Sequence, residues 1–86
     1  MKKKIQYTLY VLKCADDTLY TGITTDMERR LLEHNSSELG AKYTRARRPV
    51  KLVYHKSYKD RSEASIEESR IKKLPRSKKL ELIGGL

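Results

Sequence analysis

The chain has 86 residues, and its 20 lysines and arginines outnumber its 11 aspartates and glutamates, which gives a formal net charge of +9 at pH 7. This length excludes an enzyme with separate cofactor and substrate domains, and it allows only a small hydrophobic core. Leu, Ile and Val make up 19 of the 86 residues and Phe and Trp are absent, a composition that approaches that of disordered chains. Six tyrosines and a clear apolar periodicity nevertheless favour a single folded domain over residues 1–86, with its core at about 7–83.

The single cysteine, Cys14, excludes an internal disulfide and a zinc ribbon, because both need more cysteines. Lys13 directly precedes it, and polar side chains interrupt residues 5–12, which argues against a cleaved signal peptide. No apolar run approaches the roughly 18 residues that a membrane span needs. We therefore expect a cytoplasmic protein without a membrane partner, in which Cys14 is a buried structural thiol rather than a reactive one.

The first elements in chain order are a predicted β-hairpin and a helix. Residues 7–14 and 19–24 are rich in β-branched, aromatic and aliphatic residues, and residues 15–18 (Ala-Asp-Asp-Thr) between them are typical of a turn. Residues 25–28 (Thr-Asp-Met-Glu) match a capping box with Thr25 as the N-cap, which predicts a helix to about residue 36. Its buried side would carry Met27, Leu31 and either His34 or Asn35.

The rest of the chain predicts one further strand and three helices. Residues 41–48 are expected to form a single helical turn that ends at Pro49, and residues 50–57 to form the third strand. A second capping pattern at residues 60–63 begins a helix to about residue 74, and Pro75 suits the first turn of a last helix that ends before Gly84. The order β-β-α-α-β-α-α predicts a small α+β fold with a three-stranded, mainly antiparallel sheet flanked by helices.

Basic residues are concentrated in two stretches of the sequence. Residues 40–59 contain seven lysines and arginines and no aspartate or glutamate. Residues 72–79 contain five more lysines and arginines. Such surfaces attract phosphates, so salt-dependent binding of nucleic acid is expected; the alternative is a solvated basic face. Tyr43, within the first stretch, is expected to be a core anchor, and its alternative role is to stack on an unpaired base. The expected nucleic-acid contacts are Lys42, Tyr43, Arg45, Arg47, Arg48, Lys72 and Lys73.

Arg30 and His34 are spaced i, i+4 on the first predicted helix, so both project from one face, close to Tyr20 at the end of the hairpin. An arginine can hold a phosphate through two hydrogen bonds, and a histidine can donate to a phosphate or to a leaving oxygen. The alternative is an exposed arginine and a histidine that caps the end of the helix.

Two adjacent glutamates lie at or near the predicted buried side of the second long helix. The apolar stripe of that helix is Ala64, Ile71 and Leu74, with Glu67 inside it and Glu68 at its edge. A buried carboxylate needs a cation or a hydrogen-bond donor, which is either a structural arginine or a Mg²⁺ ion beside a bound phosphate. Helical geometry does not choose between the two glutamates.

Tyr10 and Tyr20 share a face of the sheet only if the hairpin loop has an odd number of residues. Both would then be core residues or, close to cations that lower the phenol pKa, groups that orient or activate a water molecule.

Several of these motifs together resemble the GIY-YIG nuclease superfamily. They are Thr8-Leu9-Tyr10, Leu19-Tyr20-Thr21-Gly22-Ile23-Thr24, Arg29-Arg30 and His34-Asn35. Residues 40–45 (Gly-Ala-Lys-Tyr-Thr-Arg) and 48–50 (Arg-Pro-Val) are similar to its small stand-alone bacterial branch, and the resemblance covers about residues 7–83.

The resemblance implies a metal-dependent phosphodiesterase site. It would place one Mg²⁺ or Mn²⁺ ion on Glu68 and a charge-stabilising role on Arg30, with His34 one turn later. Tyr10 or Tyr20 would activate the attacking water and the other would position it. Gly22 would allow a close approach of its neighbours.

The sequence departs from the family pattern at two places. Thr-Leu replaces Gly-Ile before Tyr10, and the late asparagine of many family nucleases is missing, since the only asparagine is Asn35. Phosphate positioning would then pass to Lys72, Lys73 or Ser77. No appended DNA-binding domain is expected, so selection by substrate structure rather than by base sequence is predicted.

The favoured hypothesis is a monomeric, metal-dependent endonuclease acting on nucleic acid, on DNA rather than RNA. The alternatives are a nucleic-acid-binding module without catalysis and a protein-interaction domain for an acidic partner.

Overall fold

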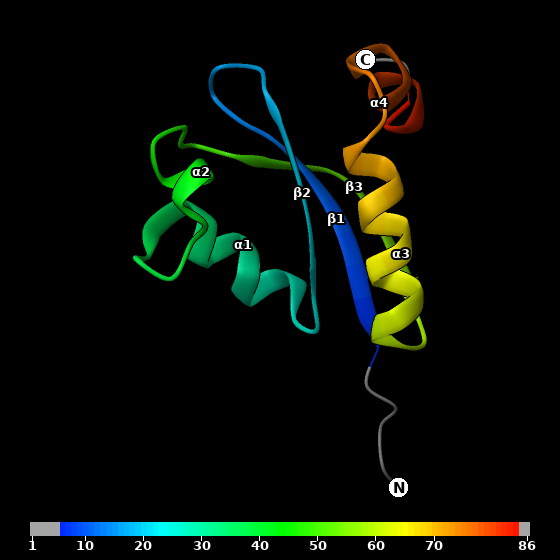
Figure 1. Cartoon of the computed structure of the whole chain (residues 1–86). Coiled ribbons are helices and arrows are strands. Elements are labelled where there is room, and N and C mark those ends of the chain that lie inside the picture. The colour runs from blue at the N-terminus through cyan, green and yellow to red at the C-terminus, as the bar shows by residue number, and fades with distance from the viewer. Residues whose placement is uncertain (1–5, 85–86) are drawn as a thin grey trace, which may run out of the picture.

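A computed structural model of the protein describes residues 6–84 and contains three strands and four helices. Their order confirms the predicted α+β fold (Figure 1). The elements are β1 (Tyr7–Lys13), β2 (Leu19–Thr24), α1 (Met27–Ser36), α2 (Lys42–Arg45), β3 (Lys51–Tyr58), α3 (Arg61–Lys72) and α4 (Arg76–Leu82).

The sheet has the strand order β2-β1-β3, and both pairs of strands are antiparallel. The hairpin pairs Lys13 with Leu19, so its loop consists of the five residues 14–18. In this register Tyr10 lies opposite Gly22 and Leu12 lies opposite Tyr20. The odd loop length therefore puts Tyr10 and Tyr20 on the same face of the sheet.

The central strand β1 is covered on both faces, which explains its run of four buried residues from position 9 to 12. Tyr10 and Leu12 form one core with Cys14 and Val50, against which Met27 and Leu31 of α1 pack; the buried position expected for Cys14 is confirmed. Leu9 and Val11 point to the opposite face, where α3 packs on β1 and β2. Figure 1 shows α1 and α3 on opposite sides of the strands.

The N-cap of α1 is Asp26 and not Thr25, one residue later than expected. The Asp26 carboxylate accepts a hydrogen bond from the Arg29 amide at 3.1 Å, and the Thr24 hydroxyl accepts one from the Asp26 amide at 3.1 Å. Asp is one of the strongest N-cap residues, and Thr24 stabilises the turn that leads into it. Asp60 caps α3 through the Glu63 amide, as the second capping pattern predicted.

Two side chains hold the end of α1 against the segment before β3. Asn35 accepts from the Val50 amide at 2.7 Å and donates to the Val50 carbonyl at 3.0 Å. The Arg48 guanidinium donates to the main-chain oxygens of Glu33, His34 and Ser37. These bonds tie the end of α1 to the segment before β3, and the Glu33 and Ser37 oxygens also accept from the Ser37 and Gly40 amides. Within residues 6–84 no helix is both long and apolar enough to cross a membrane.

Candidate active site around Tyr10

Tyr10 is buried on β1, and its ring lies across Gly22 on the neighbouring strand. A Cβ atom built on Gly22 would lie 2.5 Å from the Tyr10 hydroxyl oxygen and 2.7 Å from the ring carbon that carries it. Real Cβ atoms essentially never approach other atoms so closely. The close approach expected at Gly22 is therefore present, and the neighbour that requires it is the Tyr10 phenol.

We expect Gly22→Ala to destabilise the fold by about 1–3 kcal/mol, because the added methyl group must displace a buried ring. Urea unfolding followed by circular dichroism measures this change. Tyr10→Phe is the control, since it removes the phenol hydroxyl without introducing an overlap. A midpoint for Gly22→Ala equal to that of the wild type would contradict the packing described here.

A chain of hydrogen bonds runs from Tyr10 through two further buried side chains. The Tyr10 oxygen is 2.8 Å from Nε2 of His34, Nδ1 of His34 is 2.7 Å from the Thr44 hydroxyl, and that hydroxyl donates to the Ala41 carbonyl at 2.9 Å. A carbonyl cannot donate, so the single hydroxyl hydrogen of Thr44 is used there and Thr44 accepts from Nδ1. His34 therefore carries its hydrogen on Nδ1, and Tyr10 donates to Nε2.

The buried histidine is neutral at physiological pH. Burial is the main cause that lowers the pKa of His34 to about 4, and the charges of Arg30 and Arg48 lower it further, while Glu33 opposes them. The alternative of a helix-capping histidine at the surface is wrong, because His34 is fully buried and its ring bonds to Tyr10 and Thr44.

Tyr10 is a neutral phenol whose charged neighbours come from two helices. Burial raises the pKa of Tyr10 to about 12; Arg30 lowers it, and negative charge on Tyr20 or Glu68 raises it. Arg30 belongs to α1 and Glu68 to α3, which lie on opposite sides of the sheet. The Tyr10 hydroxyl is thus the point at which the charges of both helices act.

Arg30 is fixed rather than freely exposed, which corrects the alternative of an ordinary surface arginine. Its side chain is 24% exposed, and Nη1 donates to Oε1 of Glu33 at 2.8 Å and to the Leu39 carbonyl at 2.8 Å. Glu33 is not among the site residues predicted from the sequence, although its i, i+3 spacing from Arg30 is typical of a helical ion pair. The Leu39 carbonyl has no local sequence signal, because it follows the helix in a turn.

The rings of Tyr20 and Tyr43 extend the site toward α2. The Tyr20 ring centre lies 5.3 Å from that of His34, 6.4 Å from that of Tyr10 and 5.9 Å from that of Tyr43, on which it stacks. The Arg47 guanidinium lies 3.9 Å from the Tyr43 ring centre. The core-anchor expectation for Tyr43 is wrong, since 36% of this residue is exposed.

The two glutamates of α3 differ in the tyrosine on which their charge acts. Both carboxylates are partly exposed, at 21% for Glu67 and 23% for Glu68, and both pair with a basic residue of the same helix, Arg70 and Lys72 respectively. Burial is the main cause of the raised pKa of Tyr58 and of Tyr10; the charge of Glu67 also raises the pKa of Tyr58, and the charge of Glu68 makes the smallest contribution to the raised pKa of Tyr10. Of these two glutamates, Glu68 is the one whose charge acts on the Tyr10 phenol.

The donor atoms around Glu68 suit one kind of metal ion. The described part of the chain has no group of three or more His, Cys, Asp and Glu side chains that could enclose an ion. Mg²⁺ is often held by one or two carboxylates and completes its shell with water and phosphate oxygens. A single, partly exposed carboxylate fits that requirement and does not fit a protein-enclosed zinc site.

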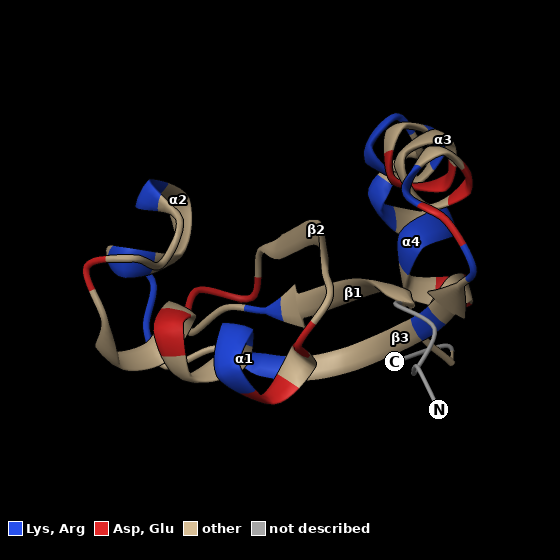
Figure 2. Cartoon of the chain, turned by 90° about the horizontal axis from the view of Figure 1, so that it is seen from below, with Lys and Arg blue, Asp and Glu red and all other residues tan. Residues whose placement is uncertain are grey.

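The basic residues expected to bind nucleic acid fall into two groups. Three of them interact with other groups of the protein. Arg48 donates to a main-chain oxygen at the end of α1, Arg47 pairs with Asp16 at 3.0 Å, and Lys72 pairs with Glu68 at 3.1 Å. No ion pair within residues 6–84 involves the other three, which are Lys42, Arg45 and Lys73. Figure 2 shows basic segments on α2 and at α3 and α4, at two ends of the molecule.

Comparisons with known proteins give a consistent assignment. A UPF0213 protein of Desulfotalea psychrophila is 57% identical over 75 residues, which is 87% of this chain and 68% of that protein. The solution NMR structure of a UPF0213 protein from Bacillus halodurans has a TM-score of 0.59 and 42% identity, covering 91% of this chain and 82% of that chain. The NMR structure of a protein from E. faecalis has a TM-score of 0.64 and 46% identity, covering 94% and 85%.

The family model described as the GIY-YIG catalytic domain matches residues 6–81, which is nearly the whole region that the structure describes. This match and the UPF0213 relatives agree with the family resemblance that the sequence motifs indicate. The chain belongs to the GIY-YIG family.

Proposed function

We propose that the protein is a nuclease that hydrolyses phosphodiester bonds of nucleic acid, of DNA rather than RNA, with Mg²⁺ or Mn²⁺, and that it selects substrates by structure rather than by base sequence. The observation that carries this proposal is the Tyr10 hydroxyl, held by His34, on which the charges of Arg30 and Glu68 both act. A phenol on which a guanidinium and a carboxylate charge act can bind and orient the water molecule that attacks a phosphate.

Arg30 would bind the scissile phosphate. Its Nη1 hydrogens are used by Glu33 and Leu39, which leaves the hydrogens on Nε and Nη2 available. Nε and Nη2 form the fork that binds two oxygens of one phosphate. The guanidinium then stabilises the negative charge that grows on the phosphate as the reaction proceeds.

Tyr10 would pass a proton from the attacking water to His34, and Tyr20 would help to position that water. Because Tyr10 donates to Nε2, its oxygen lone pairs can accept a hydrogen bond from water. As the water oxygen bonds to phosphorus, its proton moves to the Tyr10 oxygen and the Tyr10 proton moves to Nε2 of His34. One P–O ester bond breaks, and the leaving oxygen takes a proton from a second water; the hydroxide that remains takes the proton back from His34 by way of Tyr10, which restores both side chains. An ion on Glu68 would supply Lewis-acid polarisation of the phosphate when bound.

A second candidate function is a nucleic-acid-binding module without turnover. The ion pair between Glu68 and Lys72 favours it, because an ion must displace Lys72 before it can bind this carboxylate. This function predicts salt-dependent binding and no metal-dependent cleavage.

A cleavage assay on single-stranded, duplex and branched substrates, with Mg²⁺, Mn²⁺ or a chelator, tests the proposal. We expect metal-dependent cleavage that falls at least about 100-fold in Arg30→Ala, the usual size of the loss when one charge-stabilising donor is removed. Arg70→Ala, on the exposed side of α3, is the matched control and should retain activity. Equal activity in Arg30→Ala and the wild type would identify a contaminant, and binding without cleavage would favour the second function.

A further inference from the structure

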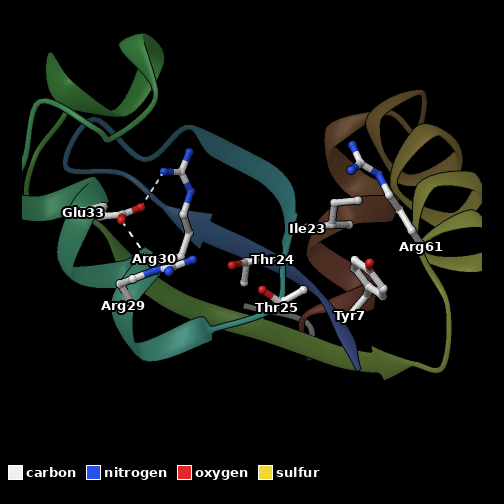
Figure 3. A pocket seen from close by; sticks show the side chains of 8 residues that line it. All are labelled: Tyr7, Ile23, Thr24, Thr25, Arg29, Arg30, Glu33 and Arg61. Atoms are coloured by element: carbon white, nitrogen blue, oxygen red, sulfur yellow. Dashed lines mark hydrogen bonds and ion pairs between the residues drawn. The ribbon is translucent and has the colours of Figure 1, made fainter. Parts of the chain in front are cut away.

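A pocket with a volume of about 360 Å³ lies next to the candidate active site, between α1 and the start of α3. Figure 3 shows Arg29 and Arg30 on the α1 side of this pocket, Arg61 on the α3 side, and Thr25 and Tyr7 between them. A water molecule occupies roughly 30 Å³ in the liquid, so the pocket has room for about twelve waters, or for a hydrated phosphate group with part of its sugar.

The pocket carries an excess of positive charge. Three arginines line it with one carboxylate, Glu33, which pairs with Arg29 at 3.6 Å and with Arg30 at 2.8 Å. Arg61 takes part in no ion pair among residues 6–84. The pocket therefore has an excess of two positive charges, one on α1, where two arginines share one carboxylate, and one on Arg61 at the start of α3.

Arg30 belongs both to this pocket and to the surroundings of Tyr10. A ligand in the pocket would therefore lie beside the phosphate under attack. The pocket wall offers donors that suit phosphate oxygens, namely the guanidinium of Arg61 and the hydroxyls of Thr25 and Tyr7, while the Thr24 hydroxyl is engaged with Asp26.

We propose that this pocket is a second phosphate subsite, which binds the phosphate next to the scissile one and has Arg61 as its main contact. The inference rests on the proposed function for its substrate class. The subsite adds Arg61 of α3 to the residues that bind the substrate, and it would hold the nucleic-acid strand so that the scissile phosphate lies at Tyr10. The phosphate belongs either to the interior of a strand or to a 5′ end, and both sources present non-bridging oxygens that a guanidinium can bind.

Binding without turnover tests this subsite separately from catalysis. Fluorescence anisotropy in chelator would measure the affinity of the wild type, Arg61→Ala and Arg76→Ala for a labelled duplex across a salt series. Arg76→Ala is a matched control, because Arg76 is also the first residue of a helix, exposed and outside the pocket. We expect the log–log salt slope to fall by about 0.9 more for Arg61→Ala than for Arg76→Ala, the change for one lost phosphate contact.

A neutral methylphosphonate placed at each position of the strand in turn would locate the contact. At one position the methylphosphonate should weaken binding by the wild type, and the same substitution should not weaken binding by Arg61→Ala any further. If that position is the 5′ phosphate, the pocket binds a strand end; if it is internal, the pocket binds the continuous strand. Glu33→Gln, which removes the pocket's negative charge, should tighten binding.

The subsite would be overturned if Arg61→Ala and Arg76→Ala lost equal affinity and if the methylphosphonate at every position weakened binding by Arg61→Ala as much as binding by the wild type. The proposed nuclease function would remain intact. Failure of the wild-type protein to bind any nucleic acid at low salt would instead overturn the proposed function itself.

Discussion

Glu68→Gln is expected to lower phosphodiester cleavage by at least about 100-fold, which corresponds to about 2.7 kcal/mol of transition-state stabilisation. Glutamine preserves the size and the hydrogen-bonding oxygen of the side chain but removes the charge that would hold a divalent ion. Initial rates in Mg²⁺ and in Mn²⁺ measure the change.

Glu67→Gln is a close control for this experiment. Glu67 is the preceding residue, is exposed to nearly the same extent and also pairs with a basic residue on α3, but its charge raises the pKa of Tyr58 rather than that of Tyr10. Each variant loses one exposed ion pair, which is worth about 1 kcal/mol or less, so both should remain folded. Glu67→Gln should stay within about threefold of the wild-type rate. Equal losses in both variants would show that the effect is general electrostatics and not a metal site.

The secondary structure could be predicted because its signals are local. Stretches rich in β-branched, aromatic and aliphatic residues indicated the strands, and side chains at the starts of α1 and α3 indicated their caps, with an error of one residue at Asp26. Because the hairpin loop has an odd number of residues, five, Tyr10 and Tyr20 lie on the same face of the sheet. The sequence alone could not supply that number, since two to five residues all close a hairpin.

The candidate site was harder to predict because its contacts join distant parts of the chain. Thr44 accepts from His34 ten residues earlier, and Arg48 reaches the end of α1 from fourteen residues away. Neither contact has a spacing rule in the sequence. Arg48, which was expected to contact nucleic acid, donates to the main chain of α1, and the buried ring of His34 bonds to Thr44.

The choice between Glu67 and Glu68 shows the same limit. A helical wheel gives the angle between two side chains but not how the helix is rotated on its sheet. The packing of α3 on the sheet lets the charge of Glu67 act on Tyr58 and that of Glu68 act on Tyr10. The resemblance to the GIY-YIG superfamily implies the metal-binding role for Glu68, and that role stays a prediction.

The buried histidine should make the fold sensitive to mild acid. Burial lowers the pKa of His34 from 6.5 to about 4, so between these values the unfolded chain binds a proton that the folded protein does not. Unfolding is then favoured as the pH falls, and the stability from this residue is complete above about pH 6.5 and lost toward pH 4. The full difference is about 3 kcal/mol, a large part of the stability of a small domain.

Urea unfolding at a series of pH values from 7 to 4.5, on the wild type and two histidine variants, measures this effect. His34→Gln should be less stable at pH 7, because it loses the bonds to Tyr10 and Thr44, but its stability should fall less between pH 7 and 4.5. His55→Gln changes the other histidine, which is exposed on β3, and should keep the wild-type pH dependence. Acidic residues titrate in the same range in all three proteins, so the difference between the two variants isolates His34. Parallel curves for His34→Gln and His55→Gln would mean that the imidazole is protonated in the folded state, and the direction of the Tyr10 hydrogen bond would then be reversed.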